Sequence, residues 1–138
     1  MRVRLASPAR ETMERAWRAA RPHEACGLLF GEAAGGDVWV RSASVAANVA
    51  ATPAQAFEVD PRHLLEVQRA ARAGGPAAVG VWHSHPSGPL APSAADRAGV
   101  TDPTWVWIIV GPGGLAAWLP DREAALGFRP LPVEPPLL

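Results

Sequence analysis

Short apolar runs alternate with helical segments along this chain, and such alternation indicates a mixed α/β domain. Ser7-Pro8 and Asp60-Pro61 each join a capping residue to a proline, which is favoured at the first helical position. Two helices are predicted at residues 8–20 and 61–73, and a third begins at Ser93. The predicted strands span residues 23–31, 38–40, 56–59, 77–85, 105–110, 115–119 and 128–133. With 138 residues, the chain fits one domain, residues 1–138, that ends in a Pro-rich stretch at about 120–138.

Patterns within these segments predict finer features. Gly35-Gly36-Asp37 suits a hairpin turn, and residues 46–54 and 86–92 are predicted loops. The tryptophans in the apolar strands are predicted core residues: Trp82, Trp105 and Trp107. Four positions of the second helix are predicted to face inward: Leu64, Leu65, Gln68 and Ala71.

Composition excludes several classes of protein and site. Hydrophobic residues make up 49% of the chain and charged residues 19%, so there is apolar material for a core. Thirteen arginines balance 13 acidic residues, which gives no electrostatic footprint for nucleic acid or an anionic membrane. The single cysteine, Cys26, excludes an internal disulfide and a four-cysteine zinc site, and we expect a buried, inert thiol. The chain starts without an apolar leader, and no stretch approaches the ~18 apolar residues of a membrane span, so we expect a cytoplasmic protein.

The residue types of a metal site gather between residues 83 and 96. His83 and His85 are two apart at a strand end, so their side chains share a face, roughly 6–7 Å apart along the strand. The Pro/Gly loop lets the chain turn back, and Asp96 in the first turn of the next helix can add a carboxylate oxygen. Two imidazoles and a carboxylate suit Zn²⁺ and leave a fourth position for water. Ser93-x-x-Asp96 also reads as a capping box, which needs no metal and is compatible with one.

This segment resembles the motif of the JAMM metallopeptidases. His-x-His, seven residues, Ser, two residues and Asp match His83, His85, Ser93 and Asp96, and the upstream glutamate of the family matches Glu24. Asn48 and residues 57–61 are also similar to short prokaryotic single-domain members. The resemblance implies an MPN/JAB-type mixed sheet flanked by helices, an architecture like that of cytidine deaminase.

The same resemblance implies a function and roles for the residues. One zinc ion per chain is held by His83, His85 and Asp96, Glu24 is the general acid/base, and Ser93 donates to the developing oxyanion. The implied substrate is a ubiquitin-like or sulfur-carrier protein, cut after its C-terminal Gly-Gly. The sequence leaves open whether an isopeptide link is split or an amino acid such as cysteine is released. It also leaves the oligomeric state open, a homodimer included.

Other readings of the motif remain to be separated from this one. A nucleoside deaminase needs Pro-Cys-x-x-Cys, which one cysteine cannot supply. A RadC-like DNA-associated protein shares a similar loop, and a non-catalytic MPN-type scaffold shares the fold. No insertion interrupts residues 77–96, so we expect the enzyme to read mainly the Gly-Gly tail, laid against a sheet edge, with little discrimination by the leaving group.

Overall fold

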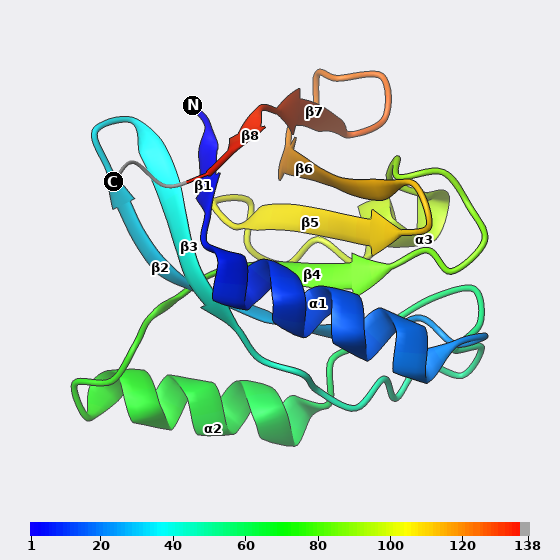
Figure 1. Ribbon diagram of the computed structural model, residues 1–138, viewed down its shortest axis with the longest axis horizontal. Helices are drawn as coiled ribbons and strands as arrows, with labels where there is room; N and C mark the ends of the chain where they lie inside the picture. The colour runs from blue at the N-terminus through cyan, green and yellow to red at the C-terminus, as the bar shows by residue number, and fades with distance from the viewer. Residues whose placement is uncertain (136–138) are drawn as a thin grey trace.

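The computed structural model describes residues 1–135, which form an eight-stranded sheet and three helices (Figure 1). The helices are α1 (Ser7–Ala20), α2 (Pro61–Arg72) and α3 (Ala94–Ala98). The strands are β1 (Val3–Leu5), β2 (Cys26–Ala34), β3 (Asp37–Ala43), β4 (Ala78–Ser84), β5 (Val106–Gly111), β6 (Gly114–Pro120), β7 (Phe128–Leu131) and β8 (Val133–Glu134). The mixed α/β prediction is confirmed, and the last three positions of the Pro-rich stretch lie outside the described residues.

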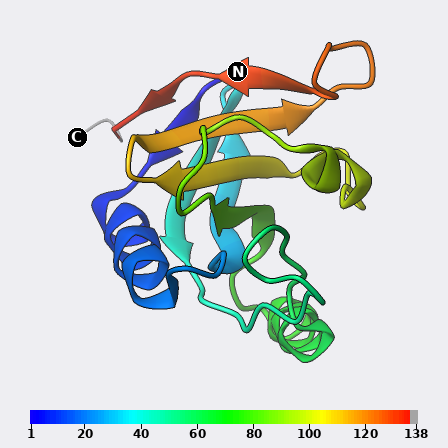
Figure 2. The ribbon, with the colours of Figure 1, turned by 90° about the vertical axis from the view of Figure 1, so that its right-hand side faces the viewer.

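The sheet runs in the order β7-β6-β5-β4-β2-β3-β1-β8, with β4 near its middle. β4 pairs antiparallel with β2 and parallel with β5. β7 and β8 are separated by Pro132 alone, yet they pair at opposite ends of this order, with β6 and β1. Pro132 itself accepts a hydrogen bond of 2.9 Å from the Val3 N–H. The C-terminal segment therefore connects the two ends of the sheet, as Figure 2 shows along the top of the molecule.

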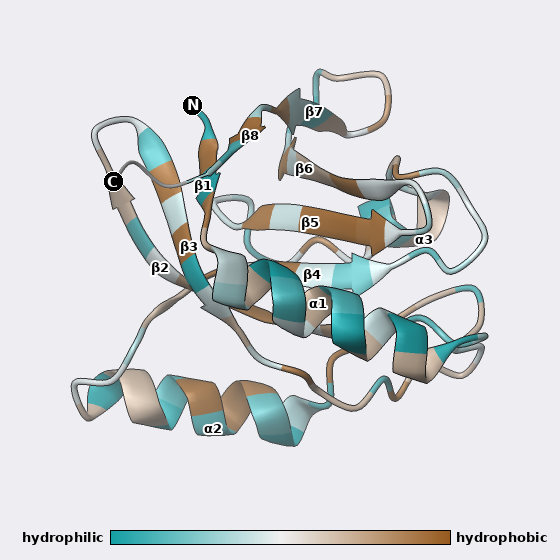
Figure 3. Cartoon of the chain, viewed as in Figure 1, coloured by the Kyte–Doolittle hydropathy of each residue, from teal (hydrophilic) through white to brown (hydrophobic). Residues whose placement is uncertain are grey.

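The two faces of the sheet carry separate apolar layers. On one face, Met13 and Trp17 of α1 pack in a cluster that includes Trp82. On the other face, Val81 and Trp107 belong to a second cluster, which takes side chains from α2 and from the segment before it. Figure 2 shows α1 on one side of the sheet and α2 and α3 on the other, and Figure 3 shows the hydrophilic outer side of α1. Because side chains alternate along a strand, β4 directs every second residue toward the α2–α3 side.

The predicted hairpin at Gly35-Gly36 is confirmed. The two glycines alone connect β2 to β3, and their φ angles are 63° and 82°. Positive φ at both central residues defines a type I′ turn, whose twist matches that of the paired strands. Glycine adopts this conformation without steric cost.

Residues 56–59 do not form the predicted strand. They are extended, and one antiparallel bridge joins Val59 to Asn48. The three-residue strand β1 was not predicted, because a segment so short carries no period of its own and is set by its pairing with β3 and β8. Ser7 also does not cap α1, which begins after Ala6.

The predicted inner face of α2 is partly wrong. Leu64 and Val67 pack against the second apolar layer, whereas Leu65 is 45% exposed and Gln68 is exposed as well. Every residue of α2 is at least partly exposed. The helix lies along the margin of the molecule (Figure 1), and the side of it that carries Leu64 and Val67 packs against the second apolar layer.

Candidate active site

β4 delivers two histidines to one point on the α2–α3 side of the sheet. The His83 side chain is fully buried, and His85 is 8% exposed. Their Nε2 atoms are 3.0 Å apart. His85 follows the last residue of β4 but stays aligned with β5, because its N–H donates to the Val110 carbonyl at 2.9 Å. The predicted convergence of both imidazoles is therefore present.

α3 brings Asp96 to the same point through a capping box. The Asp96 N–H donates to Ser93 Oγ at 3.1 Å, and the Ser93 N–H donates to Asp96 Oδ2 at 2.9 Å. Asp96 Oδ1 lies 3.1 Å from His83 Nε2, and Oδ2 lies 3.2 Å from His85 Nε2. The capping role and the approach to the histidines occur together, since the cap fixes the carboxylate that faces the two rings.

The donor atoms fit a metal ion. His85 Nδ1 lies 2.7 Å from the Pro89 carbonyl, so Nδ1 carries the ring hydrogen and Nε2 presents a lone pair. Burial lowers the pKa of His83, which favours the neutral, metal-binding form of that ring. Burial raises the pKa of Asp96, but the two imidazoles beside its oxygens and the Ser93 N–H outweigh burial and hold that pKa well below its usual range. One atom from each of Glu24, His83, His85 and Asp96 lies within 4.8 Å of the others, all buried. Two imidazole lone pairs and a carboxylate at these distances form a donor set that can hold a cation between them.

Glu24 lies at the edge of this cluster, just before β2. Its side chain is buried, and burial raises the pKa of Glu24 to about 7. Among the described residues, its Oε1 atom is buried without a hydrogen-bond partner. The Glu24 N–H donates to the Pro53 carbonyl at 2.7 Å, and the Glu24 carbonyl accepts from Asn48 Nδ2 at 3.0 Å. A carboxyl group whose main chain is fixed while its oxygen is unpartnered is suited to exchange protons with a water molecule.

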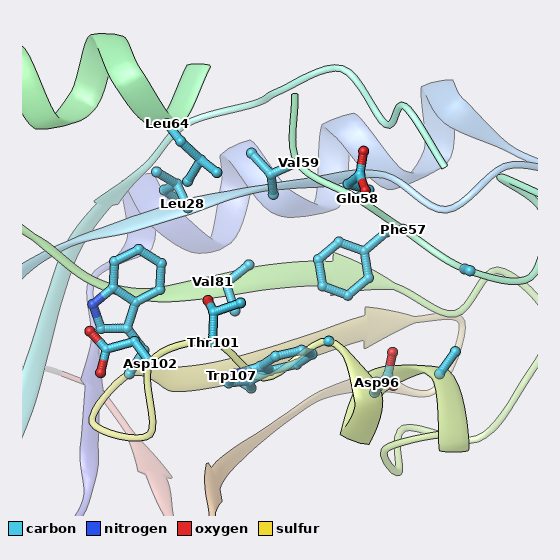
Figure 4. Close-up of a pocket in the computed structure, with 14 residues that line it drawn as sticks. Leu28, Phe57, Glu58, Val59, Leu64, Val81, Asp96, Thr101, Asp102 and Trp107 are labelled. Atoms are coloured by element: carbon cyan, nitrogen blue, oxygen red, sulfur yellow. The ribbon is translucent and has the colours of Figure 1, made fainter. Parts of the chain in front are cut away.

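Two cavities flank the cluster. The smaller, about 290 Å³, is lined by Glu24, His85 and Ser93 together with prolines and small residues of the loop after β4. The larger, about 320 Å³, lies on the other side of Asp96. Figure 4 shows its apolar walls, with Phe57 and Val59 above and Trp107 below. The site thus offers one compartment at the reactive groups and one apolar compartment beside them.

Sequence reasoning missed how three residues support the site. Phe57 stacks on His83, with ring centroids 4.2 Å apart and an interplanar angle of 17°. Ser84 lies between the two histidines and so faces the opposite way, where its Oγ accepts from the Ala25 N–H at 2.8 Å. That orientation could have been inferred from the strand period, since a buried hydroxyl needs a partner. The contacts of Phe57 and Asn48 join residues far apart in sequence and leave no local signal.

Cys26, near the site, matches its predicted environment. Cys26 is fully buried, and burial raises the pKa of its thiol to about 12, as expected for an inert cysteine. His23, next to Glu24, is exposed.

Comparisons with known proteins identify the family of this chain. Residues 6–121 match the family model described as prokaryotic homologues of the JAB domain. A desampylase of Haloferax volcanii is 39% identical over 93 residues, which cover 67% of this chain and 66% of the relative. A desampylase of Pyrococcus furiosus is 32% identical over 112 residues, 80% of this chain and 76% of the relative. A probable TtuB-protein conjugate cleaving protease of Thermus thermophilus is 35% identical over 83 residues, 57% of this chain and 54% of the relative.

Solved structures agree with this assignment. A solution structure of a protein from Desulfitobacterium hafniense has a TM-score of 0.83 and 30% identity, and the match covers 97% of this chain and 92% of that one. Another, from Salinibacter ruber, has a TM-score of 0.63 at 24% identity over 99% of this chain and 92% of that one, and shows the fold alone. Within residues 1–135, the structure contains no helix that is both long and apolar enough to cross a membrane. The family model covers most of the sequence, and the chain therefore belongs to the prokaryotic homologues of the JAB domain, as the resemblance to the JAMM metallopeptidases predicts.

Proposed function

We propose that this chain is a zinc-dependent isopeptidase that cuts after the C-terminal Gly-Gly of a ubiquitin-like or sulfur-carrier protein. The observation that carries the proposal is the buried group of His83, His85, Asp96 and Glu24. The names of the relatives, two desampylases and a probable TtuB-protein conjugate cleaving protease, support a protein conjugate as substrate.

The proposed reaction uses the buried group of four side chains together with the hydroxyl of Ser93. His83, His85 and Asp96 would hold one zinc ion, which when bound supplies Lewis acidity toward a water molecule and the scissile carbonyl. Glu24 accepts a proton from the attacking water and delivers it to the amine as the C–N bond breaks. The Ser93 hydroxyl accepts from the Asp96 N–H, so its own hydrogen remains free to be donated to the developing oxyanion.

The extended segment 56–59 is the proposed binding edge for the Gly-Gly tail. The outermost strands of the sheet, β7 and β8, contribute no residue to the described lining of either cavity, so the tail needs another backbone near the reactive groups. The main-chain groups of Glu58 point toward the loop at Asn48 and Val49. The Glu58 carbonyl accepts from the Val49 N–H at 3.0 Å, and the Glu58 N–H donates to Asn48 Oδ1 at 3.1 Å. Because backbone groups alternate along an extended chain, those of Phe57 and Val59 point the other way. This edge borders the larger cavity, which can take an apolar side chain of the added strand.

The smaller cavity is the proposed site of the leaving group. Glu24 and Ser93 line it, and the rest of its lining is dominated by Pro86, Pro89 and Pro92 with small residues. A surface of prolines and small residues can accept an aliphatic amine, but it does not distinguish between the molecules to which that amine belongs. We therefore expect conjugates that share one tail but differ in the leaving group, from a single amino acid to a whole protein, to have similar kcat/KM. A preference above ~100-fold for one protein-sized leaving group, or ~2.7 kcal/mol of transition-state binding, would contradict this expectation.

Metal content and cleavage together test the proposed function. Purified protein should hold about one zinc per chain, cleave a carrier conjugate, and lose activity on chelation. His83→Ala should lose most of the bound zinc, since two ligands remain where three are needed. The exposed His23 is the matched control, and His23→Ala should keep both zinc and activity.

Other outcomes would point elsewhere. Full zinc occupancy in a His83→Ala, His85→Ala double variant would remove the metal assignment. Stoichiometric zinc without cleavage of any conjugate would favour the non-catalytic scaffold, and tight binding to DNA without cleavage would favour the RadC-like reading.

A further inference from the structure

We infer that Asn48 is a positioning residue for the proposed reaction, which fixes the general base and the tail-binding edge relative to each other. The inference rests on the proposed function. Asn48 is half-buried in the loop between β3 and α2 and lies beside Glu24 and segment 56–59, both of which it contacts through its side chain.

The Asn48 amide uses its hydrogen-bonding groups on both sides. Its Nδ2 donates to the Glu24 carbonyl at 3.0 Å and to the Ala56 carbonyl at 3.0 Å. Its Oδ1 accepts from the Ala50 N–H at 3.0 Å and from the Glu58 N–H at 3.1 Å. A primary amide has two donor hydrogens and an acceptor oxygen with two lone pairs, so this set occupies all of them. An aspartate has the shape but lacks the two donors, and an alanine has neither.

These hydrogen bonds join the proposed general base, Glu24, to the proposed tail-binding segment 56–59. Glu24 is the proposed proton carrier, and two residues of this loop hold its main chain: the Pro53 carbonyl accepts its N–H, and Asn48 donates to its carbonyl. Ala56 and Glu58 flank Phe57, whose ring stacks on His83. One side chain thereby sets the distance from the carboxyl group of Glu24 to the backbone that would hold the scissile bond.

Loss of the amide should reduce both binding and turnover. Without Asn48 the edge at 56–59 loses the bonds that keep it extended, so KM for a conjugate should rise. The Glu24 main chain loses one of its two loop contacts, so kcat should fall, because displacement of a catalytic group by about 1 Å costs up to ~100-fold in rate. The histidines and Asp96 are not bonded to Asn48, so zinc content should not change.

The experiment compares Asn48→Ala and Asn48→Asp with Ser44→Ala. Ser44 lies in the same loop, and its Oγ accepts from the Leu28 N–H at 3.1 Å and lies 2.7 Å from His63 Nε2. Ser44→Ala therefore removes loop hydrogen bonds without touching Glu24 or segment 56–59. Melting temperature, zinc content, kcat and KM are measured for each, with the kinetics taken well below every melting transition.

The expected result is that both Asn48 variants keep zinc, raise KM and lower kcat, each by at least about 10-fold, while Ser44→Ala lowers only the melting temperature. In Asn48→Ala, faster hydrogen exchange at the Ala50 and Glu58 amides should accompany the kinetic change, whereas Asn48→Asp keeps an acceptor for both amides. Asn48 variants with kcat and KM equal to those of Ser44→Ala would overturn the inference alone. A wild-type chain that cleaves no conjugate would overturn the proposed function, and the inference with it.

Discussion

Glu24 and Asp96 are both buried carboxyl groups near one point, yet their surroundings push their pKa values apart. Burial raises the pKa of Glu24 to about 7. Asp96 faces two imidazoles and accepts a hydrogen bond from the Ser93 N–H, and these contacts lower its pKa despite burial. A pair of carboxyl groups with divergent pKa values indicates two roles, one as proton carrier and one as permanent anion. This contrast supports the proposed roles, proton transfer for Glu24 and metal binding for Asp96.

Glu24→Gln tests that division of roles. The amide keeps the size of the side chain but carries no titratable proton, so zinc content and melting temperature should stay near the wild-type values. Activity should fall by the ~10²–10⁴-fold typical of general acid–base catalysis. Steady-state kinetics on a carrier conjugate, with zinc measured on the same sample, tests both the loss of activity and the unchanged zinc content. Near-normal turnover would show that another group moves the proton.

At the level of elements, Ser93 serves α3 and the proposed reaction at once, and two substitutions separate these roles. Alanine at a helix N-cap costs ~1 kcal/mol, whereas glycine costs only a few tenths. Ser93→Ala and Ser93→Gly both remove the hydroxyl, so kcat should fall equally in the two variants if the hydroxyl donates to the oxyanion. Thermal unfolding should show a clear loss of stability for Ser93→Ala alone. A loss of kcat that tracks the melting temperature instead would assign Ser93 to the cap only.

Elements with local signals could be predicted from sequence. α3 and its cap follow from Ser93-x-x-Asp96, and the β2–β3 hairpin follows from Gly35-Gly36, because in both the stabilising contacts join residues within a few positions. His83, His85 and Asp96 could be predicted from their spacing, whereas Glu24 follows only from the resemblance to the family, and the structure brings all four together.

Features that depend on distant partners could not be predicted. Residues 56–59 have the composition of a strand, but their only strand-like partner is a single position of an irregular loop. The register of α2 was misjudged at Leu65, since periodicity alone does not show which of two adjacent apolar residues a narrow contact will cover. The stacking of Phe57 on His83 likewise exists only after the chain has folded.

At the scale of the whole molecule, a buried arginine joins the first and last strands. Arg4 is 6% exposed and donates to Glu134 at 2.8 Å and to Asp37 at 3.3 Å. Hydrogen bonds from Arg2 and Arg4 hold the pKa of Asp37 below its usual range. A lowered pKa means that this stabilisation is present above the ordinary pKa of aspartate and is lost as the pH falls through the lower, folded-state value.

Arg4→Gln should therefore destabilise the fold at neutral pH, by roughly 1.5–3 kcal/mol for lost charged hydrogen bonds at a buried site. Arg2→Gln is the matched control, because Arg2 meets the same two acidic residues with a side chain that is 45% exposed, and its loss should be smaller. Urea unfolding at pH 7 and at decreasing pH measures both. The difference in the free energy of unfolding between wild type and Arg4→Gln should become smaller in acid. Equal losses of this free energy in the two variants at pH 7 would contradict a special role for Arg4.

The connection of both sheet ends by residues 128–134 also bears on how the protein is made. A ribosome releases β1 first and the C-terminal strands last, and domains normally fold as they emerge. Here β1 lies between β3 and β8, and β6 pairs with β7, so neither end of the sheet is complete until residues 128–134 have left the exit tunnel. The proposed metal ligands His83, His85 and Asp96 are all synthesised earlier, while the sheet that positions them still lacks β7 and β8. A nascent chain stalled before residue 128 should accordingly remain sensitive to protease, and the native sheet should form only once residues 128–134 have emerged.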